Sequence, residues 1–272
     1  MKTMNKLKKD LIHLTHVYND EKLIYEKAMK LLTESDIKYL FVYLKPHCEF
    51  HRVTSLKNID YTEISDIMPP PTKCVKKWGR INMPNESLLY CSECFENSYF
   101  ENRWFYNETE IGDKISVYHT IWKTQKKLCV LYLANPNKHI EIINSLCIKD
   151  IFNKYPDIES YIPSYNLIHD IFSISQSQNR YIYSISNAII KHAKNIYHFD
   201  GVLYLNIGVG NGYNLAFYDE SIKNQDVIPQ PTVSKKECAK VDENKIEFEA
   251  NNFHKKGKIV WSKKYKRLKI DW

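Results

Sequence analysis

Three polar residues follow one another along the chain at spacings of ten and eleven residues: Arg80, Tyr90 and Glu101. Arginine grips a phosphate through a planar fork of donors, and tyrosine offers an aromatic face with a polar tip. Glutamate accepts hydrogen bonds from sugar hydroxyls and can stabilise a positive charge. If these side chains meet in one pocket, they suit chemistry on a nucleotide sugar. The alternative is that all three are ordinary surface groups, which is the usual place of arginine and glutamate.

The segment that carries these residues is predicted to run as a turn, a strand and then a helix. Gly79 precedes the arginine in the turn, residues 88–91 form a short buried strand that holds the tyrosine, and residues 96–105 are helical in pattern. Such an order lets side chains that are distant in sequence converge at one end of a strand.

The remaining pattern is that of an α+β protein, because strands occur in hairpin-like runs with helices clustered between them. Residues 3–34 repeat apolar positions at helical spacing in two runs, and Asn19-Asp20 separates the runs and caps the second. Prolines predict loops over 64–71 and 223–242. Further helices are predicted at 137–153, 165–173 and 180–195, and further strands at 39–44, 49–53, 114–123, 127–134, 201–207, 214–218, 245–249, 258–262 and 267–272.

Composition indicates a globular protein with a substantial core. The chain has 272 residues, of which 43% are hydrophobic, and a net charge of +7. Its densest basic run, residues 263–269, is typical of a solvated strand face, and no nucleic-acid-binding motif accompanies it, so no direct nucleic-acid partner is expected. We expect three parts: a helical extension over 1–37, a catalytic domain over 38–225, and a C-terminal loop with strands over 226–272 that pack on the same domain.

No targeting or membrane segment is recognised. The first ten residues are basic, and the next stretch is interrupted by His13, His16 and Asp20, which is unlike a signal peptide. The longest apolar runs, 39–44 and 128–134, are far shorter than the roughly 20 residues of a membrane helix. A cytoplasmic protein with reduced thiols and no membrane partner is therefore expected.

Familiar catalytic and metal motifs are absent from the sequence. Cys91 and Cys94 form a lone CxxC, and although Cys48 with neighbouring histidines could be imagined as the other half of a zinc site, no second CxxC or spaced His pair follows, so no metal is expected. The glycine-rich stretch 208–212 lacks a P-loop ending and leads into a strand, which favours a turn over a phosphate cradle. No acyl-transfer triad or HExxH motif occurs.

Taken together, two blocks of residues resemble the RES-domain family, which is named for an Arg, a Glu and a Ser. The first block of that family is an Arg in a short strand, a proline-containing loop, Gly-Arg-x-Asn, Leu-Tyr, and a Glu eleven residues after the Tyr. The matching residues here are Arg52, the prolines at 69–71, Gly79-Arg80-Ile81-Asn82, Leu89-Tyr90 and Glu101.

The second block is a helix, an Asp-Gly strand ending in Tyr-Pro-Ser, a glycine-containing turn, and Asn followed by two hydrophobic residues and Phe. Here these are residues 180–195, the run 200–206, the turn 208–212 and Asn214-Leu-Ala-Phe217. The resemblance covers residues 45–222, and two blocks in the correct order are more specific than either alone.

The resemblance implies a fold like the ADP-ribosyltransferase core and the consumption of NAD as a substrate, with no bound cofactor. RES-domain proteins split nicotinamide from NAD by phosphorolysis or hydrolysis, and inorganic phosphate is the co-substrate of the first reaction. Several are toxins neutralised by a small helix-turn-helix antitoxin. An antitoxin of that kind and a homo-oligomer are the protein partners to consider.

Carried over to this chain, the resemblance gives each residue a role. Glu101 would stabilise the oxocarbenium cation that forms on the ribose. Arg80 would clamp a pyrophosphate or the incoming phosphate, with Arg52 as a second cation, and Tyr90 would stack on or hydrogen-bond the nicotinamide side. The asparagines of the two blocks, Asn82 and Asn214, are expected to bind the substrate.

One position departs from the family. Asn206 stands where the family has its Ser, and Leu205 replaces the preceding Pro. Asparagine donates and accepts hydrogen bonds as serine does, so we expect Asn206 to act in the site, although it is bulkier and has no hydroxyl. A neighbour such as Ser184 or Ser186 is the alternative for the missing hydroxyl, and Glu96 is a rival for the carboxylate.

Three functions are compatible with these residues. The preferred one is an NAD-cleaving enzyme that uses phosphate or water, with the role of the toxin in a toxin–antitoxin pair. The second is a transferase that moves ADP-ribose onto a macromolecule. The third is a binding module whose catalytic site has decayed.

Overall fold

The computed structural model describes residues 3–57, 61, 63–101, 114–133, 157–205, 212–242, 245–251, 253–255, 258–260 and 267–271. The predicted helix at 137–153 and most of the glycine-rich turn, together with Asn206, lie outside these residues.

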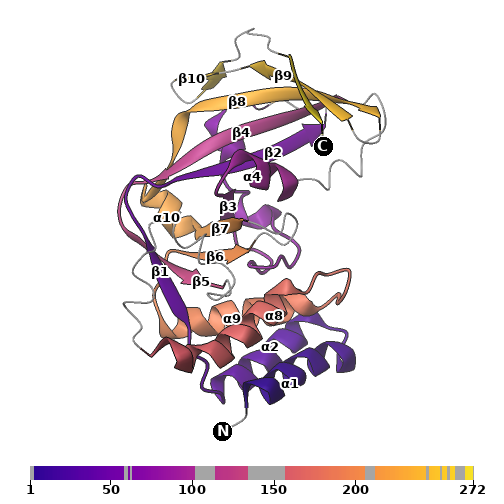
Figure 1. Cartoon of the computed structure of the whole chain (residues 1–272), viewed down its shortest axis with the longest axis vertical. Coiled ribbons are helices and arrows are strands. Elements are labelled where there is room, and N and C mark those ends of the chain that lie inside the picture. The colour runs from indigo at the N-terminus through magenta and orange to yellow at the C-terminus, as the bar shows by residue number, and fades with distance from the viewer. Residues whose placement is uncertain are drawn as a thin grey trace.

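A layer of four helices lies at one end of the molecule (Figure 1). These are α1 (Met4–Val17), α2 (Glu21–Thr33), α8 (Ile162–Ser173) and α9 (Ile182–Ile196). The two N-terminal helices confirm the prediction from residues 3–34, and the Asp20 carboxylate caps α2 by accepting from the Leu23 backbone N–H at 2.8 Å. Helix α9 is buried on most sides, because it lies between α2 and the sheet.

Ten strands form one mixed sheet in the order β1-β5-β6-β7-β3-β2-β4-β8-β9-β12. All neighbours are antiparallel except β5 and β6. The architecture is therefore α+β. The strands are β1 (Leu40–Leu44), β2 (Glu49–Lys57), β3 (Leu88–Ser92), β4 (Lys114–Thr124), β5 (Leu128–Tyr132), β6 (Gly201–Leu205), β7 (Tyr213–Tyr218), β8 (Val227–Asp242), β9 (Lys245–Asn251) and β12 (Arg267–Asp271).

Short elements complete the described fold. Strands β10 (Phe253–Lys255) and β11 (Lys258–Val260) pair with each other in a separate two-stranded sheet. The short helices are α3 (Ile64–Ile67), η1 (Thr72–Cys74), α4 (Phe95–Glu101), η2 (Ile158–Tyr161) and α10 (Asp219–Lys223). None of the helices in the described residues combines the length and apolar character needed to cross a bilayer.

The large sheet consists of two halves whose strands are paired through a single residue pair. Strand β2 pairs with β3 through a single residue pair, His51 with Ser92, whereas β2 pairs with β4 over nine residue pairs. Strands β1, β5, β6, β7 and β3 therefore form one half, and β2, β4, β8, β9 and β12 form the other. Figure 1 shows the second half lying away from the helical layer.

The half that contains β1 is buried on both faces, which explains why its strands are apolar at successive positions. Leu131, Val202 and Ala216 pack on one face against the helices, and Val130, Leu203 and Leu215 pack in a second core on the other face. Phe50 and Trp122 enter this second core from the other half of the sheet, so the two halves also share buried apolar surface.

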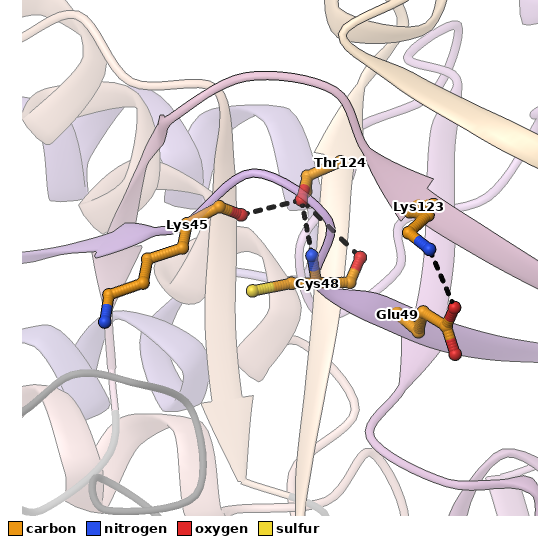
Figure 2. Close-up of polar contacts among 5 residues, drawn as sticks. All are labelled: Lys45, Cys48, Glu49, Lys123 and Thr124. Atoms are coloured by element: carbon orange, nitrogen blue, oxygen red, sulfur yellow. Dashed lines mark hydrogen bonds and ion pairs between the residues drawn. The ribbon is translucent and has the colours of Figure 1, made fainter.

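The chain passes from one half to the other at the corner between β1 and β2, shown in Figure 2. The Thr124 hydroxyl at the end of β4 donates to the Lys45 carbonyl at 2.8 Å and accepts from the Cys48 backbone N–H at 2.9 Å. Beside it, the Lys123 ammonium pairs with the Glu49 carboxylate at 3.0 Å. These contacts fix where β2 begins and thereby position His51 and Arg52 within it.

Two predicted loops are wrong in part. Residues 223–242 form the end of α10 and the long strand β8. Thr120 pairs with Val233 and Trp122 with Pro229, so β8 holds two more residues than β4 across this shift, and the prolines are tolerated at the irregularity. The second loop, 64–71, begins with the single-turn helix α3 before its prolines.

Candidate functional site

A cavity of about 610 Å³ opens where β2 and β3 diverge. Two strands that separate after one shared residue pair leave backbone and side chains facing a gap instead of each other. The cavity is lined by Arg52, Val53 and Thr54 of β2, by Leu88, Tyr90, Cys91 and Ser92 of β3, by Ser98 and Glu101 of α4, by Tyr183, Tyr204 and Asn214 of α9, β6 and β7, and by Pro70, Gly79, Arg80 and Asn82.

Six of the seven predicted site residues line this one cavity: Arg52, Arg80, Asn82, Tyr90, Glu101 and Asn214. They come from both halves of the sheet and from segments that are far apart in sequence. The seventh, Asn206, lies outside the described residues.

Arg52 is a half-buried cation without a carboxylate partner in the described part of the chain. Its Nε is shielded from solvent and has no hydrogen-bond partner there. Burial lowers the pKa of the Arg52 guanidinium, while the neighbouring Cys91 and Tyr61 act in the opposite direction. Arginine nevertheless stays charged at neutral pH, so the site holds a desolvated positive charge that an anion would stabilise.

Arg80 is held from behind by α9. The Ser186 hydroxyl donates to the Arg80 carbonyl at 2.7 Å, and the Asn187 amide donates to the Gly79 carbonyl at 2.7 Å. The guanidinium lies 5.7 Å from the centre of the Tyr183 ring, a cation–π contact. Its Nε is also buried without a partner among the described residues.

Gly79 is required by the close approach of Asn82. A Cβ on residue 79 would lie 2.2 Å from the Asn82 Oδ1, and the Gly79 N–H donates to the Asn82 carbonyl at 2.9 Å. The same Oδ1 accepts from the Tyr90 hydroxyl at 2.7 Å. Asn82 thus aligns the tyrosine with the loop that carries Arg80, and burial raises the pKa of Tyr90 well above its usual value.

Glu101 is anchored through Asn214. The Asn214 Nδ2 donates to the Glu101 Oε1 at 2.7 Å, and the Asn214 Oδ1 accepts from the Ser92 hydroxyl at 2.6 Å. Asn214 is 1% exposed, whereas Glu101 is exposed at the end of α4. A buried amide therefore holds one oxygen of a carboxylate whose other oxygen has no partner in the described residues.

Helix α4 is tied to the strands around it. The Ser98 hydroxyl accepts from the Val53 backbone N–H at 2.7 Å, and so replaces a ladder bond that β3 does not make. The Asn97 amide donates to the Glu93 carboxylate at 2.6 Å. A Cβ on Gly212, whose φ is +143°, would lie 2.1 Å from the Asn97 Nδ2, so this glycine admits the end of the glycine-rich turn beside α4.

Sequence reasoning missed two tyrosines in the cavity wall. Tyr183 is the second residue of α9, and Tyr204 lies on β6 in the second block of the resemblance. Burial raises the pKa of Tyr204 well above its usual value, while the Asn214 side chain acts in the opposite direction. Nothing in the local pattern distinguishes these tyrosines from core aromatics, although their place within the second block was an available signal.

The alternative residues do not line the cavity. Glu96 is exposed on α4, Ser184 is fully buried within α9, and Ser186 holds the Arg80 carbonyl.

Cys91 does line the cavity, but burial raises the pKa of its thiol to about 12, with Arg52 opposing the rise, so the thiol is not a nucleophile at neutral pH. In the described residues, no group of three or more His, Cys, Asp or Glu side chains could hold a metal ion.

The arrangement suits a ligand that carries phosphates at one end and a sugar at the other. Two arginines with unsatisfied donors provide the anion-binding side, and Glu101 with Asn214 provides an acceptor and a donor for hydroxyl groups. Tyr90, Tyr183 and Tyr204 supply aromatic surface. The chain matches no protein-family model, no curated protein and no solved structure.

Proposed function

We propose that this protein cleaves the bond between nicotinamide and ribose in NAD, with phosphate or water as the nucleophile, on a fold like the ADP-ribosyltransferase core. The observation that carries the proposal is the convergence of Arg52, Arg80 and Glu101 on one cavity at the split of the sheet. These are the residues that the resemblance to RES-domain proteins selects.

The chemistry follows from the charges. As the glycosidic bond breaks, its electron pair stays on the nicotinamide nitrogen and a positive charge develops on the ribose. The Glu101 carboxylate would stabilise that charge. An oxygen of phosphate or water then bonds to the ribose carbon, and attacking water gives up a proton to solvent.

The arginines would hold the anionic part of the substrate. Arg52 and Arg80 both line the cavity, so a diphosphate bound between them would compensate their positive charges. The nicotinamide leaves as a neutral molecule, so the reaction demands no strong general acid. No histidine is among the described residues that line the cavity.

The proposal is tested by incubating the purified protein with NAD, with and without inorganic phosphate, and by identifying the small products. Nicotinamide with ADP-ribose 1″-phosphate indicates a phosphorylase, and nicotinamide with ADP-ribose in both samples indicates a glycohydrolase. Glu101→Gln is expected to lower the rate by about 100-fold or more. Glu96→Gln, a change of the exposed carboxylate on the same helix, is the matched control and should leave the rate unchanged.

The other outcomes separate the alternatives. Label from NAD that remains on a macromolecule would favour an ADP-ribosyltransferase. Binding of NAD without release of nicotinamide would favour a decayed binding module in which Asn206 has replaced the family's Ser. Full activity in Glu101→Gln would refute the proposed mechanism.

The proposal extends to a toxin that acts in the cytoplasm, where NAD is abundant, and that a helix-turn-helix antitoxin neutralises. Expression of the wild-type chain should then stop growth and deplete cellular NAD. Expression of Glu101→Gln at the same level should do neither.

A further inference from the structure

Three polar side chains form one row across neighbouring strands at the floor of the cavity. Asn214 of β7 pairs in register with Ser92 of β3 on one side and with Tyr204 of β6 on the other. Residues that are directly opposite in antiparallel strands point to the same face, with Cβ atoms about 4.5–5.5 Å apart. The row is buried, with Ser92 2% exposed, Asn214 1% and Tyr204 7%.

The direction of the hydrogen bonds in this row is fixed by Glu101. An ionised carboxylate only accepts, so Asn214 must present its Nδ2 to the Glu101 Oε1, at 2.7 Å. Its Oδ1 then faces Ser92, whose hydroxyl donates to it at 2.6 Å.

Ser92 supplies the donor that the Asn214 Oδ1 needs in the orientation that Glu101 requires. If the amide rotated by half a turn, Oδ1 would face the carboxylate oxygen, and two acceptors would oppose each other. In the observed orientation, the Oδ1 has its donor and the Nδ2 is committed to Glu101. Without the Ser92 hydroxyl, the buried Oδ1 would lose this donor, and the amide would be held less firmly in the orientation that Glu101 requires.

We propose that Ser92 is a positioning residue for the reaction: it acts through Asn214 to hold the Glu101 carboxylate against the ribose carbon. This inference rests on the proposed function and assigns to Ser92 a role that its residue type alone does not suggest. A carboxylate misplaced by a fraction of an ångström loses stabilisation of the developing cation more than it loses affinity for the substrate. The effect therefore belongs to kcat, with little change in KM.

The test is a double-mutant cycle on the release of nicotinamide from NAD. Ser92→Ala is expected to lower kcat by about 10-fold to 100-fold, the range typical of residues that orient a reacting group. KM should stay within about twofold of the wild-type value. In an Asn214→Ala background, adding Ser92→Ala should change kcat little further, because the residue through which it acts is already missing.

Two controls separate positioning from loss of structure. Ser221→Ala removes another buried hydroxyl, one that donates to the Asp200 carbonyl at 3.2 Å and is outside the cavity lining, and should leave kcat unchanged. Ser92→Cys has nearly the volume of the native residue and is a weak donor, so it is expected to lower kcat in the same direction even if the alanine variant does not fold. Urea unfolding of every variant checks that it is folded under the assay conditions.

The possible results distinguish this inference from the proposed function. A wild-type protein that releases no nicotinamide overturns the proposed function and this inference with it. An active wild-type protein with wild-type kcat in both Ser92 variants overturns the inference alone. Fully additive losses for Ser92→Ala and Asn214→Ala would also overturn it, because Ser92 would then act independently of the amide.

Discussion

Arg52 shows how a single side chain can indicate that a ligand is needed. The side chain is half-buried, its Nε is shielded and has no partner in the described residues, and a partly desolvated positive charge of this kind destabilises the fold unless an anion compensates it. Arg80 is better accommodated, because the Tyr183 ring lies beside it. Binding of a phosphate-bearing ligand should therefore raise the free energy of unfolding, because the anion compensates the charge of Arg52.

The histidine pair on β2 and β4 gives the fold a predictable response to acid. The His51 Nδ1 lies 2.8 Å from the His119 Nε2, and the rings are stacked, so one nitrogen must accept and lack a proton. Burial lowers the pKa of His51, while Glu49 and Glu96 act against this shift. As pH falls, the unfolded chain binds a proton at about pH 6.5 before the folded chain does, so stability present above that pH is lost below it.

We expect His51→Gln to lose less unfolding free energy than the wild type between pH 7.5 and pH 5.5. Urea denaturation at a series of pH values measures this difference. His13→Gln, which changes an exposed histidine on α1, is the control and should follow the wild-type curve. If His51→Gln also follows the wild-type curve, the pair does not contribute to the acid response.

At the residue scale, the sequence predicted the part of the site whose members share a motif. The spacing of Arg80, Tyr90 and Glu101 was informative because a turn, a strand and a helix place them around one gap. Tyr183 and Tyr204 could not be predicted in the same way, because α9 and β6 bring them to the cavity only through tertiary packing.

Among the elements, the short helix α4 connects the two halves of the sheet beside the site. Its Ser98 contacts β2 in one half of the sheet, and its Glu101 contacts β7 in the other. A helix of two turns thus fixes the distance between the halves at the point where their own hydrogen bonding stops.

Removing the Ser98 hydroxyl should test this connection. Ser98→Ala removes the hydroxyl that accepts from the buried Val53 N–H, and we expect a loss of about 1–3 kcal/mol in the free energy of unfolding. Urea denaturation measures the loss, and hydrogen exchange at the Val53 amide should become faster. Glu96→Gln, measured at pH 8, is the control on the same helix. Unchanged stability and unchanged exchange would show that α4 does not connect the halves.

The strands illustrate where local patterns are insufficient. Residues 114–123 were predicted to form a strand, and β4 confirms it. The structure buries Val117 on one face of β4 and Tyr118, Thr120 and Trp122 on the other, and Trp122 belongs to the second core. Strand β8 was missed because its prolines indicate a loop, whereas pairing with both β4 and β9 overrides that local preference.

At the scale of the whole molecule, the N-terminal helices are part of the same core as the cavity's supporting elements. Leu7, Leu11 and Ile24 are fully buried and belong to the apolar cluster that includes α9 and the face of β6 and β7. Tyr25 of α2 also reaches Trp78, with ring centres 5.7 Å apart, beside the loop that carries Arg80. The extension therefore supports the site without lining it.

We therefore expect the helical layer and the sheet to unfold together. Leu11→Ala should lower the free energy of unfolding by about 2–5 kcal/mol, as for other large core truncations. Far-ultraviolet circular dichroism and tryptophan fluorescence should shift to the same lower urea midpoint. Lys9→Ala, an exposed change on the same helix, should shift neither signal. Separate midpoints for the two signals would mean that the helices unfold independently.

The order of strands also determines when during synthesis the site can exist. Strand β7 lies between β6 and β3 in the sheet but follows both in the chain, and Asn214 is 122 residues beyond Ser92 and 113 beyond Glu101. Contacts of such long range form late in folding. A ribosome-bound chain that has not yet released residue 218 carries its arginines and its carboxylate but lacks the strand that aligns them. The cavity is therefore completed only after residue 218 has left the ribosome, when β7 enters the sheet.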